Sequence, residues 1–216
     1  MRAIIFDMDG VISDTEPLHL DVETRLLSRA GIDARTMLSD GRYMGVPDRQ
    51  FFSEVFSKHG VTVDIDAVIA EKAALLAACA DDAITAIPGA LGLIAELRRR
   101  QVRLALASSS PRRFIDRVLR CLGLTEAFEV VVSADDVRRG KPEPDIFLAV
   151  AEQLGVSPSA CVVIEDSTNG MLAARRAGMS VVGLVSSTGV ADADLVVHDL
   201  SRLTADTLMT LGPRKC

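Results

Sequence analysis

Short apolar segments that alternate with amphipathic segments are the feature that most limits what this chain can fold into. The apolar segments are rich in β-branched residues and too short for stable helices, which is typical of fully buried parallel strands. They are Ala3–Phe6, Val102–Ala107, Glu129–Val132, Cys161–Ile164 and Val181–Val185. Amphipathic stretches of helical length lie between most of them, over residues 91–100, 114–122, 144–154 and 168–177. This alternation predicts a parallel sheet that is covered by helices on both faces.

One long segment interrupts the alternation. From Thr15 to Asp82 the sequence shows helical patterning but no convincing strand, and the α/β pattern resumes near Pro88 and Gly89. We therefore predict an α/β fold in which residues 1–14 and 83–216 form a doubly wound, Rossmann-like parallel sheet. Residues 15–82 are predicted to form an all-helical domain inserted after the first strand.

The charge of the chain limits its partners. The formal net charge of −6 argues against broad binding to nucleic acid or to anionic membranes, which require a basic surface. Arginines do gather at 98–100, 112–113 and 138–139, where solvated helix faces or loops are expected. No stretch approaches the roughly 18 apolar residues of a membrane helix, and the first acidic residue comes too early for a secretory signal. We expect a cytoplasmic protein without nucleic-acid or membrane partners.

Paired carboxylates follow two of the predicted strands, at the sheet edge where open α/β folds bind their ligands. Asp7 and Asp9 come after the first strand, and Gly10 suits a tight turn that points both at one ligand. Glu165 and Asp166 follow a later strand directly, and buried carboxylates need cations or hydrogen-bond donors. An acidic turn and a helix cap are the structural alternatives for these two pairs.

Hydroxyl and amino groups complete the set. Ser108, Ser109 and Ser110 follow the second strand, and hydroxyls with free backbone N–H groups at a helix start can bind an anion. Taken alone, the serines are better explained by a helix N-cap at Ser110, which precedes Pro111. Lys141 stands in a loop ahead of a helix, where a single lysine is usually solvated.

Taken together, these segments resemble a known family. FDMDGV, ASSS, GKPEPD and IEDS resemble, in order and spacing, the four signature motifs of the haloacid dehalogenase superfamily. The resemblance extends over essentially the whole chain, and residues 15–82 look like the cap domain of that superfamily. It implies a hydrolase of phosphate esters that works through a covalent aspartyl-phosphate.

The resemblance also assigns roles to residues. Asp7 would attack phosphorus, and Asp9 would protonate the leaving oxygen and then deprotonate water. Ser108, with the N–H of Ser109, would hold phosphate oxygens, and Lys141 would neutralise charge beside the nucleophile.

The resemblance further implies a Mg²⁺ ion. Its ligands would be Asp7, the backbone carbonyl of Asp9, Asp166, and Glu165 either directly or through water. The charges support a cation, because four carboxylates against one lysine leave −3, and like charges ~4 Å apart repel by roughly 4 kcal/mol at an effective dielectric near 20. Mg²⁺ would bring the net charge of the site from −3 to −1. We expect the pKa of Asp9 to be raised in the substrate complex.

Within the superfamily, FDMDGVISDTEPLH and GKPEPDIF most resemble the β-phosphoglucomutase and sugar-phosphate phosphatase branch. That resemblance places Thr15 and His19 near the active site, beside Gly10, although a helix cap and a surface histidine are equally good readings. Arg49 and Lys72 are candidates for gripping the distal part of a phosphorylated sugar. Arg49 falls one residue later than the arginine that holds a second phosphate in the mutases, and their arginine-lysine-asparagine run is missing around Lys72.

These observations favour a phosphatase that acts on small phosphorylated metabolites, sugar phosphates above all. A β-phosphoglucomutase-like isomerase is the alternative, and a non-catalytic phosphate-binding protein is a remote one. Dehalogenase activity is disfavoured, because family dehalogenases lack the second aspartate that Asp9 supplies. We expect a monomer, because a cap must open and close over the site.

Overall fold

The computed structural model describes residues 2–34, 38, 43, 46–185 and 193–212. Within them lies one six-stranded sheet in the order β3-β2-β1-β4-β5-β6, and all neighbouring strands are parallel. The strands are β1 (Ala3–Phe6), β2 (Arg103–Ala107), β3 (Val130–Val132), β4 (Cys161–Glu165), β5 (Ser180–Leu184) and β6 (Leu195–Val197). The predicted doubly wound α/β fold is confirmed.

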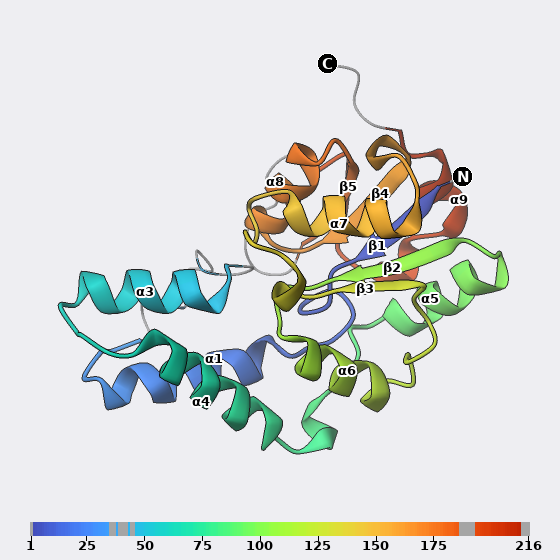
Figure 1. The fold of residues 1–216 in the computed structure, drawn as a ribbon. Helices are drawn as coiled ribbons and strands as arrows, with labels where there is room; N and C mark the ends of the chain where they lie inside the picture. The colour runs from blue at the N-terminus through green and yellow to red at the C-terminus, as the bar shows by residue number, and fades with distance from the viewer. Residues whose placement is uncertain (1, 35–37, 39–42, 44–45, 186–192, 213–216) are drawn as a thin grey trace.

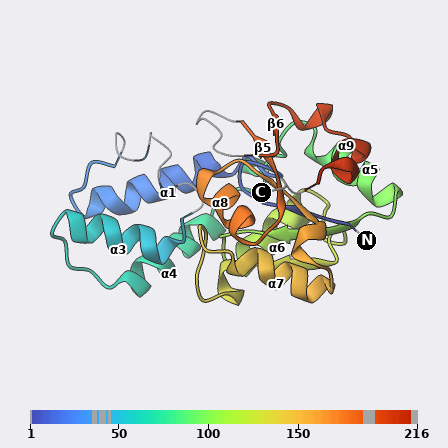
Figure 2. The same ribbon diagram turned by 90° about the horizontal axis from the view of Figure 1, so that it is seen from above.

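Helices cover both faces of this sheet (Figures 1 and 2). On one face lie α5 (Ala90–Arg99), α6 (Arg112–Cys121) and α9 (Ala205–Thr210), and on the other α7 (Asp145–Leu154) and α8 (Thr168–Arg176). The side chains of β1 alternate between the two cores, with Ile4 and Phe6 in one and Ala3 and Ile5 in the other. Burial on both faces explains why the central strands read as uninterrupted apolar runs.

Among the described strands and α-helices of the sheet domain, β6 and α9 were not predicted from the sequence. β6 is short and none of its residues is fully buried, so its sequence carries little apolar signal. α9 has only six residues, fewer than a periodic pattern needs to stand out. In addition, β4 includes Glu165, which therefore ends the strand and does not follow it.

A group of helices lies beyond the carboxyl ends of the strands (Figure 1). It consists of α1 (Glu16–Arg29), α3 (Asp48–Lys58) and α4 (Ile65–Ala77). Phe51, Phe52 and Phe56 of α3 are buried. The ring centroid of Phe52 lies 4.8 Å from that of Phe51 and 5.9 Å from that of Phe56. None of the described helices is long and apolar enough to cross a membrane.

The chain enters and leaves this helical group through two segments that lie side by side. The N–H of Asp14 donates to the carbonyl of Thr85 at 2.9 Å, and the N–H of Ile87 donates to the carbonyl of Ile12 at 2.9 Å. A bridge between Ser13 and Ala86 lies between these two bonds. The helices are thus joined to the sheet next to the end of β1.

Candidate active site

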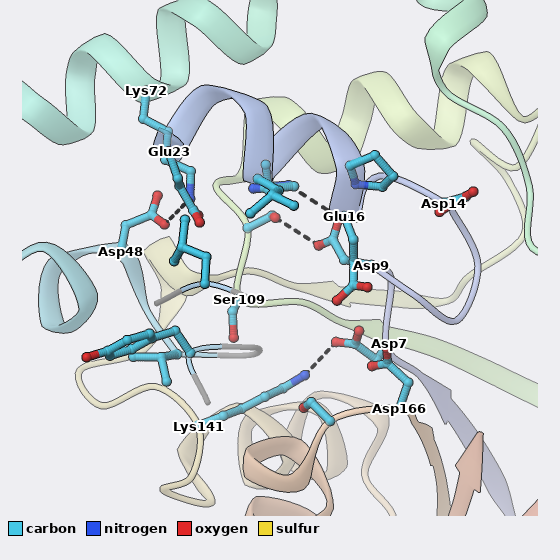
Figure 3. A pocket seen from close by; sticks show the side chains of 18 of the residues that line it. Asp7, Asp9, Asp14, Glu16, Glu23, Asp48, Lys72, Ser109, Lys141 and Asp166 are labelled. Carbon is cyan, nitrogen blue, oxygen red and sulfur yellow. Dashed lines mark hydrogen bonds and ion pairs between the residues drawn. The ribbon is translucent and has the colours of Figure 1, made fainter. Parts of the chain in front are cut away.

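A cavity of about 400 Å³ lies between the strand ends and the three helices (Figure 3). Its sheet side is formed by the segments after β1, β2 and β4 together with the loop that carries Lys141. Its helical side is formed by α1, α3 and α4. Of the residues predicted to form the site, those that line the cavity are Asp7, Asp9, His19, Lys72, Ser109, Lys141, Glu165 and Asp166.

Asp7 is held at the base of the cavity by backbone and side-chain contacts. It follows the last residue of β1, and its N–H continues the sheet by donating to the carbonyl of Ile164 at 3.0 Å. Its carboxylate accepts a hydrogen bond from Lys141 Nζ at 2.5 Å. Burial raises the pKa of the Asp7 carboxyl well above its usual range, against the opposing charge of Lys141.

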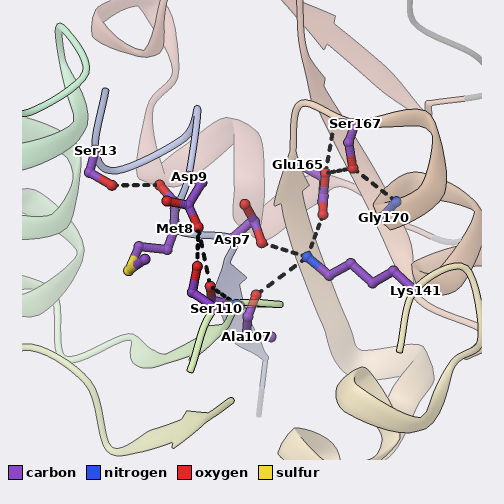
Figure 4. A network of polar contacts seen from close by, with 11 residues as sticks. Asp7, Met8, Asp9, Ser13, Ala107, Ser110, Lys141, Glu165, Ser167 and Gly170 are labelled. Atoms are coloured by element: carbon purple, nitrogen blue, oxygen red, sulfur yellow. Dashed lines mark hydrogen bonds and ion pairs between the residues drawn. The ribbon is translucent and has the colours of Figure 1, made fainter. Parts of the chain in front are cut away.

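Lys141 lies between two carboxylates (Figure 4). Its Nζ donates to Asp7 at 2.5 Å and to Glu165 Oε1 at 2.6 Å, and it lies 3.5 Å from the carbonyl of Ala107. Burial lowers the pKa of the ammonium, but the charges of Asp7 and Glu165 outweigh this and raise the pKa above its ordinary value. Lys141 is therefore a permanent positive charge at the strand ends.

Both oxygens of Glu165 are already occupied. While Oε1 accepts from Lys141, Oε2 accepts from the N–H of Ser167 at 2.8 Å and from its hydroxyl at 2.9 Å. The Ser167 hydroxyl caps α8 by accepting from the N–H of Gly170. A Cβ atom on Gly170 would lie 1.6 Å from Glu165 Oε1, so this helical position requires glycine for the carboxylate to fit.

Asp166 carries an unsatisfied oxygen. Its side chain is buried, and its Oδ2 has no hydrogen-bond partner among the described residues. A Cβ atom on Gly10, whose φ is +77°, would lie 2.0 Å from this oxygen, so Gly10 makes room for it. Burial raises the pKa of Asp166, and the charges of Glu165 and Asp7 raise it further.

These acids are close enough to share one ion. Oxygens of Asp7, Glu165 and Asp166 all lie within 4.8 Å of one another. Carboxylate oxygens are the ligands that Mg²⁺ prefers in proteins. The orphaned oxygen of Asp166 and the excess of negative charge over Lys141 both fit a divalent cation at this position.

Asp9 is surrounded by hydrogen-bond donors. Thr15 donates to Oδ1, Ser110 donates to Oδ2 at 3.0 Å, and Nε2 of His19 lies 3.4 Å from Oδ1. Burial raises the pKa of Asp9, but His19, Thr15 and Ser110 together outweigh it and lower the pKa to about 2. In the protein without substrate the shift is therefore opposite to the rise expected for the substrate complex.

Two hydroxyls of the serine run after β2, those of Ser108 and Ser110, lie near the same oxygen of Asp9. Ser108 is fully buried; its Oγ accepts from the N–H of Ser110 at 3.0 Å and lies 3.4 Å from Asp9 Oδ2. Ser109 and Ser110 line the cavity, while Ser108 does not. The N-cap of α6 is Pro111, so the Ser110 side chain binds Asp9 and does not act as the helix cap.

The candidate residues from the helical segment differ in whether they contact the site. Thr15 precedes α1 without a side-chain cap bond and contacts Asp9, and His19 packs edge-on against Phe114 at 5.2 Å. Lys72 lies in the cavity wall. Arg49 does not line the cavity: its exposed side chain forms an ion pair with Asp66.

Residues in or beside the site that were not assigned to it from the sequence include Gly170, Ser167, Glu23 and Asp48, together with Ser110, which was considered only as part of the serine run and as a helix cap. The position of Ser110 in the serine run was visible, but its contact with Asp9 was not. Asp48 stands one residue before Arg49, at the position that corresponds to the phosphate-binding arginine of the mutases.

Comparison with known proteins agrees with this geometry. The model of the family described as haloacid dehalogenase-like hydrolase matches residues 1–178. A phosphorylated carbohydrates phosphatase of Thermotoga maritima is 35% identical over 87% of this chain and 87% of its own length. The β-phosphoglucomutase of Bacillus subtilis is 32% identical over 96% of this chain and 94% of its own.

A solved structure shares the whole fold. CbbY from Rhodobacter sphaeroides, crystallised with xylulose-(1,5)bisphosphate, is 27% identical and superposes with a TM-score of 0.83 over 96% of this chain and 99% of its own. The sheet, the cavity at its carboxyl edge and these matches lead to one conclusion: this chain belongs to the haloacid dehalogenase-like hydrolase family.

Proposed function

We propose that this hydrolase is a Mg²⁺-dependent phosphatase that removes phosphate from small phosphorylated metabolites, sugar phosphates in particular, through an aspartyl-phosphate on Asp7. The observation that carries the proposal is the buried cluster of Asp7, Glu165 and Asp166, which faces a cavity of metabolite size. Among the described residues, Lys141 is the one cation that is paired with this cluster. The phosphatases of sugar phosphates among its relatives support the substrate class.

Asp7 and Asp166 would hold the metal through carboxylate oxygens, Asp9 would add its backbone carbonyl, and Glu165 would support the site while bound to Lys141. When bound, Mg²⁺ would polarise the phosphoryl oxygens and offset the charge of the nucleophile. The unsatisfied Asp166 oxygen and the raised pKa of the buried acids support this assignment.

The reaction then divides into two displacements at phosphorus. In the first, a carboxylate oxygen of Asp7 forms a bond to phosphorus, the ester bond breaks, and the leaving alkoxide takes a proton from Asp9. In the second, Asp9 accepts a proton from water as the water oxygen attacks the aspartyl-phosphate. Inorganic phosphate leaves and the Asp7 carboxylate is restored.

Two further groups stabilise the charge that develops on the phosphoryl oxygens. Lys141, fixed between two carboxylates, supplies a positive charge beside Asp7 without needing to reorganise. Ser109 lines the cavity, so its hydroxyl or N–H would contact a phosphoryl oxygen. Ser108, which does not line the cavity, would help to position Ser110 and Asp9 through its contacts with both.

Asp9 must change its protonation state for this cycle. With a pKa of about 2 it is ionised in the substrate-free protein. A phosphate dianion next to it would favour the protonated form, since a neighbouring like charge raises the pKa of a carboxyl. The donors Thr15, His19 and Ser110 would then orient the carboxyl toward the leaving oxygen.

We also propose that residues 15–82 act as a cap that sets substrate choice. Its helices form the cavity wall opposite Asp7, and the paired segments around Ser13 and Ala86 would form the hinge. The similarity to β-phosphoglucomutase keeps a sugar-phosphate mutase as the second candidate. The exposed position of Arg49 weighs against it, because no described contact places that side chain where a second phosphate would bind.

The test is the release of inorganic phosphate from a panel of sugar phosphates in the presence of Mg²⁺. The wild type is compared with Asp7→Asn and with wild type in EDTA, and circular dichroism checks that the variant is folded. Release that disappears in both controls supports the phosphatase. Conversion of β-glucose 1-phosphate to glucose 6-phosphate without release favours the mutase, and release that survives Asp7→Asn contradicts the proposed mechanism.

A further inference from the structure

The end of the cavity remote from Asp7 contains a second cluster of charged side chains (Figure 3). It consists of Glu23 from α1, Asp48 from α3 and Lys72 from α4, and all three line the cavity. We call these three residues the distal triad. Each comes from a different helix, so the helical group must be fully assembled for the triad to form.

Lys72 is committed to its two acidic neighbours. Its Nζ donates to Glu23 Oε1 at 2.7 Å and also to Asp48 Oδ1, and only 3% of its side chain is exposed. The ring of Phe52 lies 5.9 Å from the ammonium and screens it further from water. Glu23 and Asp48 are more accessible, with 17% and 21% of their side chains exposed. A ligand therefore meets the carboxylates of the triad before it meets the ammonium.

The charge of this end of the cavity is negative. Two carboxylates against one ammonium leave one negative charge on the distal triad. Glu16 and Asp14 add further acidic groups to the cavity wall, away from the triad. Lys141 is paired with carboxylates at the opposite end, and Arg49 is paired with Asp66 outside the cavity.

Carboxylates that already share a lysine still have free lone pairs, which accept hydrogen bonds from hydroxyl groups. A second phosphate at the same place would meet the one net negative charge of the triad in a partly buried site, where repulsion is weakly screened. Leu20 and Val46 also line the cavity and offer apolar contacts to the carbon skeleton of a sugar.

We propose that the distal triad is a specificity site that accepts an uncharged, hydroxyl-bearing end of a phosphate monoester and rejects a second phosphate. This inference rests on the proposed phosphatase function and narrows its substrate class to monophosphates. It separates this chain from the CbbY structure, which holds a bisphosphate, and from any mutase that must hold a second phosphate in its cap.

The test compares substrates that differ by one phosphate. Values of kcat/KM are measured at fixed free Mg²⁺ for fructose 6-phosphate against fructose 1,6-bisphosphate, and for glucose 6-phosphate against glucose 1,6-bisphosphate. The wild type is expected to favour each monophosphate by roughly tenfold or more, the effect of one uncompensated like charge at this range. Bisphosphates that are hydrolysed as well as or better than the monophosphates would overturn the inference.

Variants of the triad locate the effect. Asp48→Asn and Glu23→Gln each remove one negative charge beside Lys72, so each is expected to shift the preference toward the bisphosphate by roughly tenfold. Asp66→Asn and Glu71→Gln are the matched controls, because they remove the same charges from exposed faces of the same helical group. A shift in the controls equal to that in the triad variants would overturn the assignment to the triad.

A binding measurement separates this inference from the proposed function. The four sugar phosphates are titrated calorimetrically into the Asp7→Asn protein, where turnover plays no part. Weaker binding of the bisphosphates, relieved by adding Asp48→Asn, supports the triad even if the wild type releases no phosphate. Absence of phosphate release would contradict the phosphatase, and tighter binding of the bisphosphates would contradict the triad.

Discussion

Two buried lysines in this protein each lie between two carboxylates, yet their surroundings differ. Lys141 is held by Asp7 and Glu165 at the strand ends, and Lys72 is held by Glu23 and Asp48 among the helices. At the strand ends there is a third buried acid, Asp166, with an oxygen that no described residue satisfies. The distal triad has no such orphan.

The difference indicates what each cluster is built to receive. The strand-end cluster has an unsatisfied Asp166 oxygen and an excess of negative charge, which the proposed cation would offset. The pKa values of Asp7 and Asp166 are raised because burial and mutual repulsion oppose their ionisation. The distal triad is internally paired, and the charges of Asp48 and Glu23 raise the pKa of Lys72 despite its burial. One cluster should therefore respond strongly to Mg²⁺ and the other should not.

Replacement of each lysine tests this contrast with the largest expected effect. Lys141→Met and Lys72→Met should each destabilise the Mg²⁺-free fold by about 3 kcal/mol, because each leaves buried carboxylates without a partner. Mg²⁺ at 100 times its Kd should add about 2.7 kcal/mol to the wild type and to Lys72→Met, because both keep the strand-end acids intact. It should add more to Lys141→Met, because there the cation also replaces the positive charge lost beside Asp7 and Glu165. The measurement is urea unfolding with and without Mg²⁺.

Lys58→Met, at an exposed position of α3, serves as the control for loss of a lysine. The contrast fails if Mg²⁺ stabilises both buried variants equally.

Asp166→Asn should weaken Mg²⁺ binding and stabilise the metal-free fold. Loss of one carboxylate ligand should raise the Mg²⁺ concentration for half-maximal activity by about 100-fold, and relief of repulsion should add about 1 kcal/mol at neutral pH. A carboxyl with a raised pKa in the folded state stabilises below its unfolded pKa and loses that contribution as the pH rises through the folded value. The gain from Asp166→Asn should therefore vanish near pH 3.

Metal titrations and unfolding curves at several pH values measure both effects. Asp14→Asn, which removes an exposed acid from the same cavity, is the control. A variant that is less stable than the wild type at pH 7 without metal would contradict the repulsion argument.

Gly170→Ala tests how tightly the strand-end acids are packed. The new Cβ would lie 1.6 Å from Glu165 Oε1, so the carboxylate must move away from Lys141 and Ser167. Displacing a group that supports the metal ligands typically costs 10- to 100-fold in metal affinity, and we expect a loss within about this range. Gly92→Ala in α5 is the control, because nothing lies within 4 Å of its Cβ. Unchanged Mg²⁺ affinity in Gly170→Ala would show that Glu165 is free to move.

His19→Ala should have the smallest effect, on the pKa of Asp9. His19 contributes the largest opposition to burial at Asp9, so its removal should raise the Asp9 pKa from about 2 toward its ordinary value of 3.8. A lowered pKa stabilises the fold above the unfolded pKa and loses this contribution as the pH falls from about 4 to about 2. Carbon-13 NMR titration of the Asp9 carboxyl measures the shift, with His59→Ala as the control. An unchanged Asp9 pKa in His19→Ala would contradict the role of His19 in lowering it.

Most of the fold was predictable because its central strands are buried on both faces and so form continuous apolar runs. β6 escaped because it lies at the sheet edge with partly exposed side chains. The strand-end acids were predictable from position alone. Of the distal triad, Lys72 was named from the sequence, but its acidic partners Glu23 and Asp48 were not. Arg49 was named in place of Asp48, although α3 begins at Asp48 and each residue turns about 100° around a helix. Asp48 therefore faces the cavity while Arg49 points to solvent.

The central claim is that phosphate leaves through a covalent intermediate on Asp7. The most direct measurement is the stereochemical course at phosphorus, followed with a phosphorothioate monoester whose two non-bridging oxygens are different isotopes and which is hydrolysed in water of the third isotope. The thiophosphate released then has four different substituents at phosphorus. Each in-line displacement inverts the configuration, so two displacements through Asp7 predict net retention. Net inversion would mean that water attacks the substrate directly, and it would contradict the role assigned to Asp7.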